Sequence, residues 1–130
     1  MNIILNINSI SSNNIYFYDS VKNTIINNSN FIKITYSNNY FILNGIYIKI
    51  TIHKNSKNDT ILDKINNLET LILSLYNNNK IYNYKIIDQI NYLITKLNNS
   101  NKDIINYILK ISGIWETDSN IGLTYKFILI

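Results

Sequence analysis

The chain offers few side chains that could carry out a reaction. His53 is the only histidine and cysteine is absent, so a thiolate nucleophile and a thiolate metal site are excluded. Asp59 and Asp63 are four residues apart, a spacing at which two carboxylates on one helix face could hold a metal ion. Acids also suit the first turn of a helix, as a cap or facing the positive end of its dipole. We favour that structural interpretation.

A second pair of carboxylates, Glu116 and Asp118, could do acid–base chemistry, but its neighbours predict a turn in which acids are ordinary soluble residues. Three glycines cannot build a glycine-rich phosphate loop, and the absence of arginine removes the bidentate phosphate clamp. We therefore expect a protein that is not an enzyme and has no cofactor or metal ion.

Lysines are the side chains that could bind a ligand. The net charge of +4 comes from 12 lysines against 8 acids. Residues 20–58 contain five lysines and no acid, whereas residues 59–130 contain seven of each. A basic half of a chain favours an anionic partner, although acids are so scarce here that such a stretch also arises by chance.

Lysines alternate with aromatic residues in segments that have the pattern of strands. This combination binds single-stranded nucleic acid, because aromatic rings stack on bases while lysines follow the phosphates. The predicted binding residues are Lys33, Lys49, Lys110, Lys126, Tyr47, Trp115 and Tyr125. The alternative is that the same sheet, with its apolar C-terminal strand, binds other protein chains or itself.

These side chains must be positioned by strands in the first half of the chain. Short strands are predicted over residues 15–18, 22–26 and 40–43, and longer ones with clear alternation over residues 31–36 and 46–52. Asparagines replace glycine and proline as turn formers. Asn38-Asn39 predicts a turn, and Asn44-Gly45 predicts a tight hairpin.

The hydrophobic period then changes to that of helices. Ile61, Ile65, Leu68, Ile72 and Leu75 recur at intervals of three and four residues, which predicts a helix capped by Asp59 or Thr60. Residues 86–97 repeat this spacing, while residues 81–85 are ambiguous. Residues 104–130 alternate on both sides of a turn at 116–120, which predicts a C-terminal hairpin.

The order of elements predicts one α+β domain over residues 1–130, strand-rich over 1–53, helical over 59–98 and closed by the hairpin at 104–130. One or two helices inserted before that hairpin fit either an antiparallel barrel of the OB type or a sandwich with helices on one face. No apolar run approaches the roughly 18 residues of a membrane span, and the start lacks a signal peptide's cationic region. An intracellular, soluble protein without a membrane partner is therefore expected.

Composition and three segments point to a source. The chain holds 30 Ile and 26 Asn but no Ala, Arg, Pro or Cys, which indicates an AT-rich genome. The segment KISGIWETDSNIGLTYKFI (residues 110–128), together with FYDSVKNTI (17–25) and YFILNGIY (40–47), resembles small uncharacterised proteins of giant DNA viruses. The resemblance implies a viral protein of the host cytoplasm, at the viral factory, or of the virion. A more distant similarity to OB-fold single-stranded-DNA-binding proteins implies a barrel.

Overall fold

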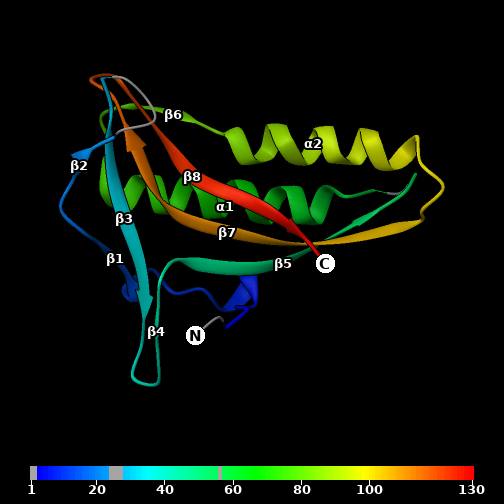
Figure 1. Ribbon diagram of the computed structural model, residues 1–130, viewed down its shortest axis with the longest axis horizontal. Coiled ribbons are helices and arrows are strands. Elements are labelled where there is room, and N and C mark those ends of the chain that lie inside the picture. Colours follow the sequence, from blue (N-terminus) through cyan, green and yellow to red (C-terminus); the bar gives the residue numbers. More distant parts are fainter. Residues whose placement is uncertain (1–2, 24–27, 56) are drawn as a thin grey trace.

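The computed structural model describes residues 3–23, 28–55 and 57–130. In these residues two α-helices accompany one mixed sheet of eight strands (Figure 1). This arrangement confirms the predicted α+β class with helices before the C-terminal hairpin, and the sheet does not close into a barrel. The strands are β1 (Ile15–Phe17), β2 (Val21–Lys22), β3 (Asn30–Ser37), β4 (Ile42–Leu43), β5 (Ile46–His53), β6 (Ile81–Asn83), β7 (Ile104–Glu116) and β8 (Asn120–Leu129). The helices are α1 (Asp59–Tyr76) and α2 (Lys85–Asn98).

The long strand β7 organises the sheet. One of its edges pairs with β8 as the predicted antiparallel hairpin. Its other edge pairs first with β5, from Ile104 to Ile111, and then with β3, from Gly113 to Glu116. The ambiguous segment before α2 becomes β6, which runs parallel to β8 and makes the sheet mixed. The short strands β1, β2 and β4 all pair with β3.

The predicted hairpin at Asn44-Gly45 is wrong. Strand β4 pairs with β3 through the Asn38–Phe41 turn, and β5 leaves it to pair with β7. Gly45 is still required, because its φ is +113° and a Cβ atom there would lie 2.7 Å from the carbonyl oxygen of Ile111. The glycine thus lets the chain cross from one strand pair to another.

Both predicted helices form, and they run side by side along the sheet (Figure 1). The expected caps are wrong, since α1 begins at Asp59 and its N-cap residue is Asn58. The inward face of α1 also differs at its end: Leu73 is completely buried, whereas the predicted core residue Leu75 is 43% exposed. The other predicted apolar positions of α1 and α2 contribute to one core with the sheet.

Part of one sequence prediction cannot be compared with the fold. The short strand expected over residues 22–26 overlaps β2 only at Lys22, and residues 24–26 lie outside the described part of the chain. The N-terminal segment reaches the edge of β5, where Leu5 forms a parallel bridge to Ile48. No helix among the described residues is long and apolar enough to cross a membrane.

Candidate functional site

The β5–β7–β8 sheet has one face covered by helices and one face without them. Residues directly opposite each other in a ladder point to the same face. Leu109 opposes Ile48 and Phe127, and the Tyr125 hydroxyl on this side donates to the Lys85 carbonyl at the start of α2. This is the helix-covered face. The outer face carries the alternate residues of these strands and of β3: Phe31, Lys33, Tyr47, Lys49, Thr51, His53, Ile104, Asn106, Ile108, Lys110, Gly113, Trp115, Gly122, Thr124, Lys126 and Ile128.

A bulge brings Trp115 to the outer face. The register between β7 and β8 shifts between Ile111 and Gly113, so Ser112 is one extra residue on β7. Without it, strict alternation would place Trp115 with Ile111 under the helices. With it, Trp115 opposes Phe31 and Gly122. A Cβ atom at Gly122 would lie 2.6 Å from the indole ring, so the ring rests directly on the glycine backbone.

Four of the predicted binding residues are lysines, and all four are on the outer face. Lys110 of β7 stands directly opposite Lys126 of β8 and beside Tyr47 of β5. Lys49 and Lys33 extend the row along β5 and β3. Within the described chain none of these lysines forms an ion pair, and no outward-facing strand residue is acidic. Glu116 of β7 faces the helices instead, where it pairs with Lys80 at 3.0 Å and accepts a hydrogen bond from Tyr76.

Two aromatic rings hold lysines of this face. The Lys110 ammonium lies 5.5 Å from the ring centre of Tyr47, and the Lys33 ammonium lies 5.1 Å from that of Tyr18. Tyr47 is only 8% exposed, so its ring offers no free face on which a base could stack. Its role on this surface is to position Lys110. Tyr18, which sequence reasoning did not select, is 53% exposed. Its proximity to Lys33 comes from the pairing of β1 with β3, which no local pattern reveals.

The structure does not bring Tyr125 to this surface. It lies on the helix-covered face opposite Ile111, and its hydroxyl bonds the backbone of α2. Burial, with the nearby carboxylates Glu69 and Asp88, raises the pKa of Tyr125. Of the seven predicted residues, six therefore share one face, and Tyr125 belongs to the packing between β8 and α2.

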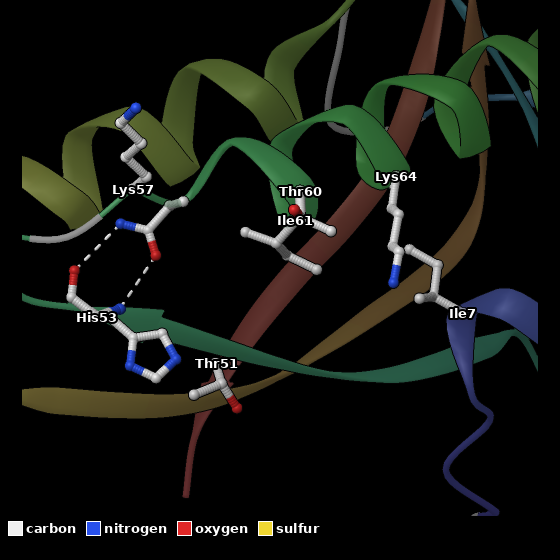
Figure 2. A pocket seen from close by; sticks show the side chains of 8 residues that line it. Ile7, Thr51, His53, Lys57, Thr60, Ile61 and Lys64 are labelled. Carbon is white, nitrogen blue, oxygen red and sulfur yellow. Dashed lines mark hydrogen bonds between the residues drawn. The ribbon is translucent and has the colours of Figure 1, made fainter.

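A cavity of about 290 Å³ opens where β5 ends and α1 begins (Figure 2). His53 lies on its strand side, and Thr60 and Lys64 lie on its helix side, with Lys57 at the rim. The side-chain amide of Asn58 accepts from the backbone N–H of His53 and donates to its carbonyl, both at 3.1 Å. This clamp joins the end of the strand to the start of the helix beside the cavity.

The described carboxylates do not assemble a metal centre. No group of three His, Cys, Asp or Glu residues among the described residues could hold an ion, and the lining of the cavity beside His53 contains no carboxylate. The most unusual acid is Glu69 of α1, which is 1% exposed. One oxygen accepts from the Ile87 amide at 3.3 Å, while the other has no partner among the described groups. Burial raises the Glu69 pKa to about 7.

Comparisons of the chain with protein-family models, with curated proteins and with solved structures gave no match. The function is therefore inferred from the site itself.

Proposed function

We propose that this protein is a non-enzymatic module that binds single-stranded nucleic acid across the outer face. The observation that carries the proposal is the row of four lysines without an acidic partner. Lys110 and Lys126 stand directly opposite each other, an arrangement of like charges that destabilises a sheet by about 0.2–1 kcal/mol. A polyanion lying across β5, β7 and β8 would offset that repulsion.

The aromatic residues of the face support a single strand as the ligand. Trp115 and Phe31 oppose each other at the end of the lysine row, next to Lys33, and are partly exposed. Stacking on such rings tolerates any base, so binding would be largely independent of sequence. An open sheet also leaves room for an extended strand, as the platform sheets of some RNA-binding domains do. The resemblance to proteins of giant DNA viruses supports a role for this activity in the viral factory or the virion.

Fluorescence anisotropy with a labelled oligonucleotide tests the proposal. Four phosphate contacts at about −0.7 each predict a slope of about −2.8 for log affinity against log salt concentration. Substituting Lys110→Gln and Lys126→Gln together should weaken binding at least about tenfold and reduce that slope by about 1.4. Emission of Trp115, the single tryptophan, should be quenched by the same oligonucleotide.

The matched control substitutes Lys96→Gln and Lys102→Gln, which removes the same charge at the far end of α2. This control should bind almost as the unchanged protein does. Absence of binding at low salt, or an equal loss in both double variants, would contradict the proposal.

A second candidate function, assembly through protein–protein contacts, is favoured by the last strand. Beyond its pairing with β6 over Asn120–Gly122, the edge of β8 away from β7 has no strand partner among the described residues. Leu129 is 59% exposed and Ile130 is 66% exposed. An unpaired edge with apolar side chains can accept a strand from another chain.

A further inference from the structure

We infer that the cavity between the end of β5 and the start of α1 binds a phosphomonoester. This goes beyond the proposed function, because phosphate could bind here whether or not a strand lies on the outer face. The charge of the lining, its geometry and its connection with β5 all favour such a ligand.

The basic side chains of the cavity come from three parts of the chain. His53 ends β5, Lys57 belongs to the connection that follows, and Lys64 lies in the second turn of α1. Neither lysine forms an ion pair in the described chain. The acids of α1 lie on other sides of the helix. With 100° per residue, Asp63 lies about 100° and Asp59 about 140° around the helix axis from Lys64. The lining is therefore positive without a counter-charge.

The geometry leaves room for an anion between these groups. Figure 2 shows the His53 ring and the Lys64 ammonium on two sides of the cavity, with the Thr60 hydroxyl between them at the helix. Lys57 points away from the His53 ring, and an exposed lysine changes rotamer within nanoseconds. Because the Asn58 clamp uses only the backbone of His53, the imidazole is left available to a ligand.

The chemistry selects a phosphomonoester among anions. Near neutral pH this group carries about −1.5 to −2 charges and three acceptor oxygens. The Lys64 ammonium, the imidazole and the hydroxyl supply donors from two sides of the cavity, and the Lys57 ammonium matches the remaining charge when it turns inward. Ile7 and Ile61 provide apolar walls for the organic part of the ligand. Thr51 and His53 also belong to the strand that carries Lys49, so a strand bound on the outer face could end in this cavity.

The single histidine makes the test direct. In a titration followed by NMR, inorganic phosphate and then a mononucleoside monophosphate should shift the His53 ring resonances with saturation. Lys64→Gln should weaken this binding about tenfold, as the loss of one charged contact does. Lys96→Gln, which makes the same change in charge on α2, should not. Unshifted His53 resonances at millimolar phosphate, or equal losses in both variants, would overturn the inference.

Oligonucleotides with and without a 5′-phosphate identify the source of the ligand. Tighter binding of the phosphorylated strand that is lost in Lys64→Gln would indicate that the ligand is the end of a strand. Saturation by the mononucleotide, with no difference between the two oligonucleotides, would indicate that the ligand is a free nucleotide. A response of His53 to phosphate without oligonucleotide binding would support the cavity and contradict the proposed function. Oligonucleotide binding without a response of His53 to phosphate would support the proposed function and contradict the phosphate site in the cavity.

Discussion

At the scale of single residues, the most consequential side chain is the buried Glu69. Its carboxyl group lies among α1, α2 and β8, with Asp88 and Tyr125 as charged or ionisable neighbours. The Ile87 amide at the start of α2 satisfies one oxygen, while the other is buried without a partner among the described groups. A protonated carboxyl suits this position better than a carboxylate, and this explains a pKa of about 7.

Glu69 should make the protein less stable as the pH rises. The unfolded chain releases this proton near the ordinary value of 4.5, whereas the folded protein keeps it to about 7. Between these values the folded state binds the additional proton, so raising the pH from 5 to 8 removes up to about 3 kcal/mol of unfolding free energy. Urea unfolding at the two pH values measures this loss.

Glu69→Gln keeps an acceptor for the Ile87 amide but cannot ionise. It should resemble the unchanged protein at pH 5 and be more stable at pH 8. Asp118→Asn, at an exposed turn, is the control and should retain the original pH dependence. If the unfolding free energies of the unchanged protein and of Glu69→Gln change in parallel between pH 5 and pH 8, the pKa of Glu69 is not raised in the folded protein.

At the scale of elements, α1 shows how packing selects one face of a helix. Its apolar residues extend over more than one face, and the sheet covers only part of them. Leu73 is completely buried beside Ile72, whereas Leu75 is 43% exposed near the helix end. Periodicity alone allows either leucine to continue the stripe, and the position of β8 and α2 decides which one is covered.

Truncating these two leucines should therefore have unequal effects. Leu73→Ala creates a cavity in the core and should cost about 2–5 kcal/mol of unfolding free energy. Leu75→Ala removes the same atoms from a position that water already reaches, and should cost less than about 1 kcal/mol. Chemical unfolding of both variants measures the difference. Similar losses would mean that Leu75 is also covered in solution.

At the scale of the whole molecule, the lysines of the outer face are separated from the acids. The outer face carries lysines and aromatic rings, while the described acids occupy the helices, the turns and the helix-covered side of β7. The free edge of β8 carries the exposed apolar end of the chain. Nucleic-acid binding and self-assembly would therefore use neighbouring but different surfaces.

Self-assembly through β8 predicts a molecular mass that rises with protein concentration. Leu129→Gln should reduce this rise because it removes apolar surface beside the edge. Leu75→Gln changes another exposed leucine, on α1, and should leave the rise unchanged. Analytical ultracentrifugation with and without an oligonucleotide separates the two functions, since assembly through β8 should not require nucleic acid. A monomer at every concentration would exclude this second candidate.

Much of the local structure follows from the sequence alone. The helical period of residues 61–97, the alternation of β3, β5, β7 and β8, and the turn at Asn38-Asn39 depend on neighbours within a few residues. Alternation along β7 before the bulge and along β8 also determines that Lys110 and Lys126 point away from the buried isoleucines and leucines. Composition explains why isoleucine builds the core and asparagine the turns.

The tertiary structure decided which strands pair and which face of the sheet the residues after the β7 bulge occupy. Asn44-Gly45 has the local chemistry of a hairpin, yet β5 gains more by pairing with eight residues of β7 than it could with the two-residue β4. One inserted residue, Ser112, transfers Trp115 to the lysine-bearing face, because side chains on a strand alternate with a period of two. Contacts between distant segments also created the His53 cavity and the buried site of Glu69, which local sequence patterns cannot encode.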